Sequence, residues 1–236
     1  MTEQELKQKY GNEKVLVVEN DYYESWLRVG ESPMKALENA VTKRGYYEYR
    51  YKAELDTSLR QVIPYVVLKN DGKYLITKRL KGDSRLVGKH SIGVGGHVDH
   101  ADYERGRGVN DIVDFRNTVI NCIKRELREE TTYDGLNGEL NIKLSDVFID
   151  DSSDVSRVHI CILTEVELYN VCNEIEINEV DKLEGQWVSV EELNDLIDKG
   201  TNFENWSEVA IEKLGLRKVK AKEVKPKAKK KGAKKQ

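Results

Sequence analysis

One segment of the chain, residues 115–130, has the clearest hydrophobic periodicity and therefore constrains the fold most. Its apolar residues recur at every fourth position, at Phe115, Val119, Ile123 and Leu127. In an α-helix this spacing gathers apolar side chains on one face, which is buried only when the helix packs against other apolar groups. The segment is therefore expected to be an amphipathic helix that covers a hydrophobic core.

Three glutamates of this segment share one patch of the predicted helix surface. Glu126, Glu129 and Glu130 stand at positions i, i+3 and i+4, so their carboxylates project from the same side. Each pair of like charges costs roughly a few tenths of a kcal/mol on an exposed helix. A solvated acidic face is one interpretation of the cluster. A site for Mg²⁺, which takes carboxylate oxygens as ligands, is the other.

The segment upstream of this helix contains a pair of glycines. The sequence KHSIGVGGHVDH, residues 89–100, alternates apolar and small residues as far as Gly95 and Gly96. This pattern is typical of a strand that ends in a turn where the backbone approaches another group closely. The glycine turn and the carboxylate helix together form the candidate site of the chain.

These two motifs resemble the Nudix box, the loop and helix signature of the Nudix (MutT-type) hydrolases. The run Arg125-Glu126-Leu127-Arg128-Glu129-Glu130 matches the second half of that box letter for letter. The remainder departs from the box, because Asn117 takes the place of a glutamate, Thr132 replaces the closing glycine, and the spacing after Gly96 is longer. We assign the extra length to a loop inserted near residues 101–114. This loop is expected to overhang the pocket and to affect substrate choice.

The resemblance extends from about Arg50 to Ile197. Two segments are similar, more narrowly, to a poorly characterised branch of MutT-type phosphoesterases: Ile63-Pro64-Tyr65-Val66-Val67 and Ser91-Ile92-Gly93-Val94-Gly95-Gly96-His97. The resemblance implies an α/β (α+β) fold, the Nudix α/β/α sandwich with a mixed sheet. It also implies a pyrophosphohydrolase that acts on a nucleoside diphosphate linked to another group, as in a nucleotide, a dinucleotide, a nucleotide sugar or a capped RNA end.

The resemblance also assigns roles to individual residues. The implied ligands of Mg²⁺ or Mn²⁺ are the carbonyl of Gly95 and the carboxylates of Glu126, Glu129 and Glu130. Arg125 is implied to orient these carboxylates by a charge-assisted hydrogen bond. The bound cation would activate a water for attack on one phosphorus of a pyrophosphate and stabilise the leaving phosphate. Glu129 is the first candidate for the general base, and the alternatives are Glu179 and Glu184.

Substrate contacts are expected from residues near the end of a hairpin strand and around the glycine turn. The candidates are Arg79, Arg85, His90, Gly96 and His97. For the basic residues among them, ordinary solvation at the surface is the alternative. No second His or Cys stands at zinc-ligand spacing from His97, so the sequence does not predict a zinc site.

Other patterns predict the organisation of the chain. Residues 62–69 and 73–80 are expected to form a β-hairpin, because Asn70-Asp71-Gly72 accepts the positive φ angles of a tight turn. Strands are also expected over 14–18, 45–54, 144–149 and 158–168, and helices after Ser32-Pro33, after Ser189 and over 204–215. The expected parts are an N-terminal extension (1–55), a Nudix domain (56–216) and a disordered basic tail (217–236).

Charge is distributed unevenly between the tail and the rest of the chain. Residues 217–236 carry a net charge of +10, which leaves −13 on residues 1–216, because the whole chain carries −3. A flexible basic segment attracts phosphate backbones without sequence preference. The tail is therefore expected to bind nucleic acid weakly, or to act only as a solubilising terminus.

Composition excludes several classes of protein. The chain has 236 residues, of which 39% are hydrophobic and 34% charged, and it contains no apolar run long enough to span a bilayer. The three cysteines form no close pair, so neither disulfides nor a zinc knuckle are indicated. A cytoplasmic enzyme without membrane contact is expected, and a homodimer is compatible with it. The alternatives are a non-catalytic nucleotide-sensing protein and an RNA-binding protein.

Overall fold

The computed structural model describes residues 1–81, 87–106, 113–135, 138–152, 156–170, 175–178 and 180–218. Several predictions concern residues outside these ranges. They are those on Arg85, Glu179, residues 107–112 of the inserted loop, and the basic tail beyond Lys218. These predictions remain predictions.

The described residues form a mixed nine-stranded sheet with β3 at its centre. Strand β3 pairs in parallel with β8 along one edge, and antiparallel with β1, β6 and β4 in turn along the other. The remaining strands extend this arrangement, with β2 beside β1, β5 and β9 beside β4, and β7 beside β8. The strands are β1 (Lys14–Glu19), β2 (Tyr46–Tyr49), β3 (Leu59–Asn70), β4 (Lys73–Arg79), β5 (His90–Ser91), β6 (Gly93–Gly95), β7 (Glu139–Phe148), β8 (His159–Tyr169) and β9 (Leu183–Val188).

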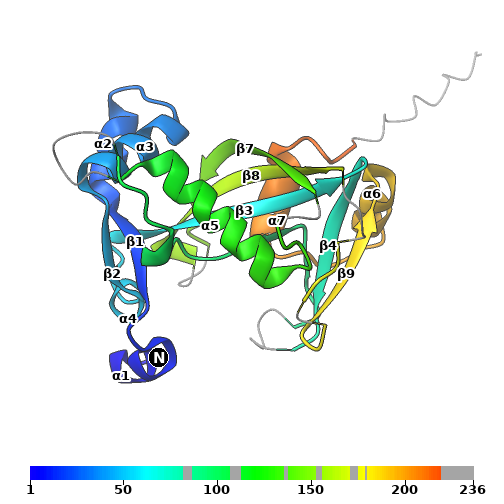
Figure 1. Cartoon of the computed structure of the whole chain (residues 1–236), viewed down its shortest axis with the longest axis horizontal. Helices are drawn as coiled ribbons and strands as arrows, with labels where there is room; N and C mark the ends of the chain where they lie inside the picture. Colours follow the sequence, from blue (N-terminus) through cyan, green and yellow to red (C-terminus); the bar gives the residue numbers. More distant parts are fainter. Residues whose placement is uncertain are drawn as a thin grey trace, which may run out of the picture.

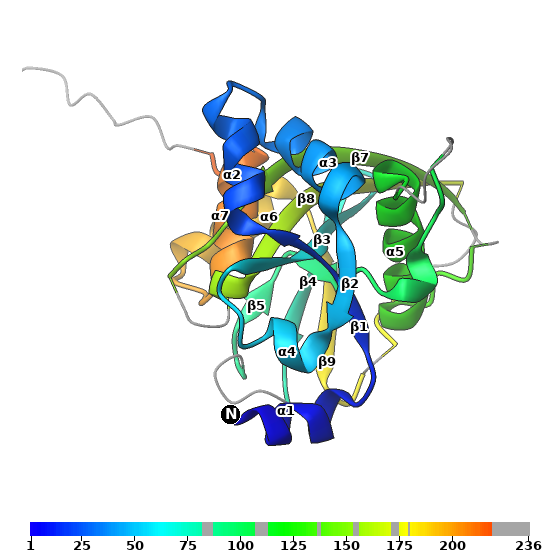
Figure 2. The same cartoon turned by 90° about the vertical axis from the view of Figure 1, so that its left-hand side faces the viewer.

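Helices cover both faces of this sheet, which confirms the predicted sandwich. Figure 2 shows the central strands between α5 on one side and α6 and α7 on the other. Two further helices, α2 and α3, pack on each other near one end of the sheet (Figure 1). The helices are α1 (Glu3–Tyr10), α2 (Asn20–Arg28), α3 (Pro33–Arg44), α4 (Arg50–Ala53), α5 (Phe115–Glu130), α6 (Val190–Asp198) and α7 (Asn205–Lys213), with 3₁₀ turns η1 (His100–Asp102) and η2 (Ser156–Val158).

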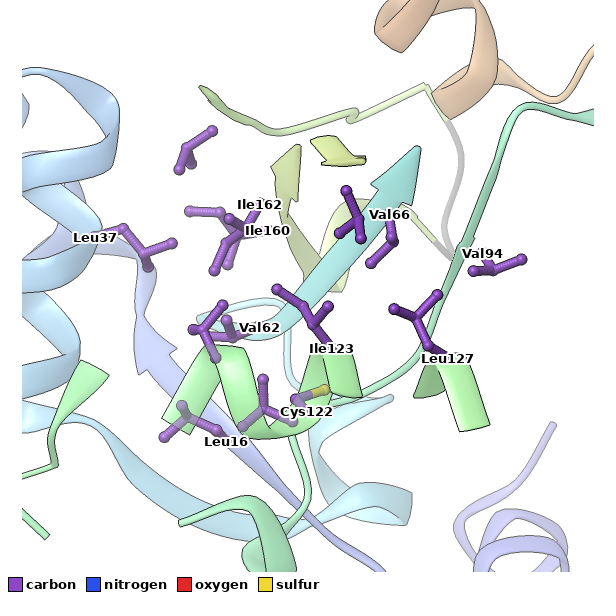
Figure 3. Packing of buried hydrophobic residues seen from close by; sticks show 14 of the residues in the cluster. Leu16, Leu37, Val62, Val66, Val94, Cys122, Ile123, Leu127, Ile160 and Ile162 are labelled. Atoms are coloured by element: carbon purple, nitrogen blue, oxygen red, sulfur yellow. The ribbon is translucent and has the colours of Figure 1, made fainter. Parts of the chain in front are cut away.

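The two-residue period of β3 explains why it is buried on both faces. Val62 and Val66 belong to the core beneath α5, whereas Tyr65 and Val67 belong to the core beneath α6 and α7. The apolar stripe of α5 supplies the other side of the first core. Figure 3 shows Cys122, Ile123 and Leu127 of that helix among the valines and isoleucines of the central strands. The amphipathic helix predicted over residues 115–130 is thus confirmed.

Local sequence patterns predicted several elements correctly. Asp71 and Gly72 adopt φ angles of 48° and 75° in the turn between β3 and β4. The Ser32 hydroxyl accepts a hydrogen bond from the N–H of Lys35 at the start of α3. The N–H of Ser189 donates to the Glu192 carboxylate at 2.7 Å, and the N–H of Glu192 donates to the Ser189 hydroxyl at 3.2 Å, which completes the capping box of α6. The further strands and the last helix also form, as β1, β7, β8 and α7.

The strand predicted over residues 45–54 is only half correct. Strand β2 ends at Tyr49, and the next four residues form the short helix α4. Arg50 contributes to this change, because its guanidinium pairs with Glu54 one helical turn later at 3.4 Å and with Glu13 at 2.9 Å. The aromatic residues favoured a strand, but ion pairs with neighbouring segments stabilise a helical turn.

The N-terminal 55 residues extend the same sheet. Strand β1 pairs with β3 through Val17, Val18 and Glu19, and β2 pairs with β1. Helices α1 and α2 were not predicted, although Thr2 and Glu5 form a capping box that could have indicated the first of them. No helix in the described part of the chain is long and apolar enough to cross a membrane.

Candidate active site

A cavity of about 580 Å³ lies between the glycine turn, the C-terminal half of α5 and residues near the N-terminus. It contains all four residues that the resemblance implied as metal ligands. The lining residues are Glu13, Arg50, Ile63, Gly95, Gly96, His97, Asp99, Arg125, Glu126, Glu129 and Glu130. The fold thus brings together the two motifs that stand on either side of the inserted loop in the sequence.

The three glutamates of α5, which we call the glutamate patch, all line this cavity but differ in exposure. The side chain of Glu126 is 9% exposed, whereas that of Glu129 is 57% exposed. Burial raises the pKa of the Glu126 carboxyl, and the neighbouring Arg125 guanidinium acts in the opposite direction. The Glu126 carboxylate is therefore buried in the wall of the cavity, whereas the Glu129 side chain is open to solvent.

Arg125 connects the glutamate patch to the rest of the site. Its Nη1 donates to Glu126 Oε1 at 2.7 Å and to Glu129 Oε2 at 3.1 Å. Its Nη2 donates to the backbone carbonyl of His97 at 2.9 Å, which ties the helix to the glycine turn. The guanidinium thus makes the charge-assisted contacts with carboxylates that were expected of it.

Asp102 holds Arg125 in place and was missed by the sequence analysis. Its two carboxylate oxygens accept from Nε at 2.9 Å and from Nη2 at 2.8 Å, a bidentate pair, and the residue is only 2% exposed. Asp102 lies at the beginning of the segment that we interpreted as an inserted loop. The first residues of that segment therefore support the carboxylates, and any shortening of the loop has to begin after Asp102.

The glycine pair approaches both the sheet and α5 closely. A Cβ on Gly95 would lie 2.3 Å from the Pro64 carbonyl oxygen, and a Cβ on Gly96 would lie 2.1 Å from Glu126 Oε1. The backbone contact requires glycine at position 95, whereas a side chain at position 96 would displace the Glu126 carboxylate. Pairing of β6 with β3 ends with Gly95 opposite Tyr65, and the next position along β3 is Pro64, which has no N–H to continue the ladder. The ladder is interrupted there, where the chain passes the Glu126 carboxylate, and contact with β3 resumes when the N–H of Val98 donates to the carbonyl of Val62 at 3.2 Å.

His97 lines the cavity, but its imidazole faces another histidine. Its Nε2 lies 3.3 Å from Nε2 of His159, the first residue of β8. Burial lowers the pKa of His97 well below its ordinary value, and the positive charge of Arg50 acts in the same direction. The sequence separation of the two histidines explains why no pattern search could have paired them.

Two predicted substrate-binding residues lie elsewhere. Arg79 and His90 are not among the described residues that line the cavity. The Arg79 Nε lies 3.9 Å from the Glu204 carboxylate, and the His90 ring packs beside Phe203. Their predicted role therefore receives no support from the geometry. Glu184, an alternative general base, lines a different cavity beside Trp187.

Three charged residues that were not predicted complete the cavity. Glu13 precedes β1, and Arg50 begins α4; both line the cavity and pair with each other. Asp99, which accepts from the N–H of Ala101 at 2.8 Å, also faces it. Their positions depend on how β1 and β2 join the sheet, so local sequence patterns could not have identified them.

Comparisons with known proteins identify one similar sequence and several similar structures. No family model matches the chain. The chain is 30% identical over 176 residues to protein YmaB of Bacillus subtilis (strain 168), a match that covers 73% of this chain and 80% of YmaB. It is also similar to the crystal structure of Tm1382, a proposed Nudix hydrolase, with 26% identity and a TM-score of 0.62 over 85% of this chain and 97% of Tm1382.

A weaker structural match is the Nudix hydrolase from Alicyclobacillus acidocaldarius, with 12% identity and a TM-score of 0.48 over 66% of this chain and 90% of that protein. The match to Tm1382 extends over nearly all of that protein, and the fold has the expected layers. The sequence of α5 contains the second half of the Nudix box, and its glutamates share a cavity with the glycine turn. The chain therefore has the Nudix fold, with the glutamates of its box-like helix α5 in the cavity.

Proposed function

We propose that this protein is a divalent-metal-dependent hydrolase that cleaves a pyrophosphate bond in a nucleoside diphosphate linked to another group. One observation supports this most directly. The carboxylates of the glutamate patch, the Gly95–Gly96 turn and the Arg125 guanidinium line a single cavity. Pure nucleotide binding does not require three carboxylates in the pocket, since they repel a phosphate.

The residues present fit a hard divalent cation. The glutamate patch and the backbone of the glycine turn supply only oxygen donors, which is the donor set that Mg²⁺ and Mn²⁺ prefer. We propose that Glu126, Glu129, Glu130 and the carbonyl of Gly95 hold this cation. When bound, it would supply charge neutralisation for the substrate phosphates and Lewis-acid activation of water.

The protein's own groups have distinct tasks in this proposal. Arg125 fixes the directions of Glu126 and Glu129, and Asp102 fixes Arg125. These contacts hold two carboxylates at defined positions before substrate enters, so less ordering is needed in the transition state. Glu126, which is buried and hydrogen-bonded, is suited to a fixed ligand.

Glu129 is the proposed general base. Its side chain is more than half exposed to the cavity and solvent, so it can take a proton from an attacking water and release it to solvent. Arg50 lies on the wall of the same cavity and is the proposed contact for a substrate phosphate. Both assignments rest on position in the cavity and on the chemistry of the side chain.

A phosphate-release screen over nucleoside triphosphates, dinucleotides, nucleotide sugars and capped RNA, with and without Mg²⁺ or Mn²⁺, tests the proposal. We expect cleavage of at least one class, dependent on the cation, and its loss in Glu129→Gln. Glu212→Gln, an exposed change on α7, is the matched control and should keep full activity. Nucleotide binding without turnover in any class would instead support the sensing alternative.

A further inference from the structure

Three side chains from distant parts of the chain meet beside the cavity. His97 follows the glycine turn, His159 begins β8, and Glu54 follows α4. One potential ligand atom from each lies within 4.8 Å of the other two. We call these residues the histidine cluster. It shares no residue with the glutamate patch.

The distance between the two imidazoles matches a shared metal ion. The Nε2 atoms of His97 and His159 are 3.3 Å apart. Two nitrogen ligands at normal zinc distances in a tetrahedral arrangement lie about 3.3 Å from each other. The planes of the two rings meet at 65°, so the rings are not stacked. This arrangement is compatible with two ligands of one ion. A single N–H···N hydrogen bond between the imidazoles would produce a similar distance. The role of Glu54 therefore distinguishes a metal site from a hydrogen bond.

Glu54 favours a cation over a hydrogen bond between the histidines. A pair of neutral imidazoles is satisfied by one shared proton and requires no carboxylate, whereas a metal ion attracts one. The Glu54 side chain is only 13% exposed, and Arg50 contacts one of its oxygens at 3.4 Å. Since a carboxylate has two oxygens, contact with Arg50 leaves capacity for a metal.

We propose that His97, His159 and Glu54 bind one transition-metal cation of the Zn²⁺ type, separate from the hard cation of the glutamate patch. Two imidazoles and one carboxylate are a known ligand set for zinc sites that keep a fourth position for water or substrate. Oxygen-rich Mg²⁺ sites rarely include imidazole, so the two sites differ in the metal they select.

The position of this site implies a structural consequence. The cation would join the N-terminal 55 residues, through Glu54, to the central strand β8 and to the turn that carries Gly95 and Gly96. Metal binding would therefore stabilise the native protein and restrict the wall of the catalytic cavity.

Metal analysis of the full chain tests this inference without any activity assay. The protein is dialysed against Zn²⁺ in a large excess of Mg²⁺, which occupies the glutamate patch, and the bound zinc is measured. We expect about one zinc per chain in the wild type and in the double variant Glu129→Gln, Glu130→Gln. His97→Gln and His159→Gln should each retain at least about tenfold less zinc.

His100→Gln is the matched control, because His100 lies three residues from His97 but is exposed and outside the cluster. It should retain as much zinc as the wild type. Wild-type protein that retains no zinc, or histidine variants that retain all of it, would overturn the inference. Because the assay measures metal content alone, its result is independent of whether the protein hydrolyses nucleotides.

A second measurement needs no variant and so avoids variants that do not fold. Co²⁺ in a site with four or five ligands absorbs visible light much more strongly than octahedral Co²⁺. We expect this intense spectrum for the wild-type protein with one equivalent of Co²⁺, and X-ray absorption that shows two imidazole ligands. A weak visible spectrum, together with X-ray absorption that shows only oxygen ligands in an octahedral arrangement, would contradict the proposal.

Discussion

The glutamate patch and the histidine cluster lie beside the same glycine turn but arise from the sequence in different ways. The patch consists of residues from one helix, within five positions of each other. The histidine cluster combines residues 54, 97 and 159. Pairing of β6 and β8 with β3 brings the two histidines together, and α4, which contacts β1 and β3, brings Glu54 to them. Helical spacing determines the first arrangement, and strand pairing determines the second.

The two groups also differ in their donor atoms. The patch offers oxygen ligands, which suit Mg²⁺ or Mn²⁺, whereas the cluster offers two nitrogens and one carboxylate. His97 directly follows Gly96, so a few residues of backbone separate two sites of different chemistry. If both proposals hold, catalysis should depend on the patch, and zinc retention should depend on the cluster.

The largest expected effect comes from changes in the patch. Glu129→Gln and Glu130→Gln should each lower turnover by at least about 100-fold, because each removes a charge from the metal site and keeps nearly the same volume. Circular dichroism should show an intact fold, and zinc retention should be unchanged. Full activity of both variants in Mg²⁺ would remove the patch from the mechanism.

Gly96→Ala is expected to have the next largest effect, because the new Cβ would collide with the Glu126 carboxylate. Displacement of a metal ligand by about 1 Å can lower the rate roughly 100-fold, and we expect a loss of about 10-fold to 100-fold in kcat. Comparison of kcat with zinc content then shows how far the two sites are coupled through the shared turn. Wild-type kcat would show that the turn can move aside and that its close approach is not required.

Asp102→Asn should have a smaller effect on catalysis. The amide keeps some hydrogen bonds to Arg125 but loses the charge, so we expect about 10-fold more Mg²⁺ for half-maximal activity. The free energy of unfolding should fall by about 1–3 kcal/mol, because Asp102 is buried in a charge-assisted pair.

Glu24→Gln is the control for this variant, since its ion pair with Arg28 is exposed and should contribute less than about 1 kcal/mol. Denaturant unfolding and Mg²⁺ titration measure both effects. If Asp102→Asn behaved like Glu24→Gln in both measurements, Asp102 would have no orienting role.

The smallest expected effect concerns the basic tail, which belongs to neither site. Removal of residues 217–236 should leave the hydrolysis of a free dinucleotide almost unchanged, since the tail contributes no residue to the cavity among those described. If the substrate is an RNA end, kcat/KM for long RNA should fall at low salt and less at physiological salt, because counterion release drives this attraction. If the intact and truncated proteins cleaved long RNA at equal rates at both salt concentrations, the tail would have no part in the mechanism.

Much of the fold could be predicted because its information is local. The turn at Asp71-Gly72, the cap at Ser32 and the stripe of α5 each depend on residues within one or two turns of the chain. The segment after Tyr49 shows where this approach fails. Its aromatic residues favour a strand, but ion pairs from Arg50 to Glu13 and Glu54 accompany a helical turn there.

Local sequence patterns also failed to identify some residues of the candidate site. Asp102 was assigned to an inserted loop, because a single acidic residue in a polar segment has no distinctive pattern. Only the packed structure shows it buried beneath Arg125. Arg79 was predicted from its place at the end of the hairpin strand, and His90 from its position before the glycine turn. The two side chains lie beside Glu204 and Phe203 instead.

The sequence by itself determined the helix, its acidic patch and the glycine turn, because helical periodicity and glycine's lack of a side chain act over a few residues. Only the tertiary structure decided which distant groups complete the site: Asp102 under Arg125, Arg50 on the cavity wall, and His159 opposite His97. Their positions depend on the pairing of β3 with strands from both ends of the chain. Such pairing is set by the burial of whole sheet faces, and no short stretch of sequence contains it.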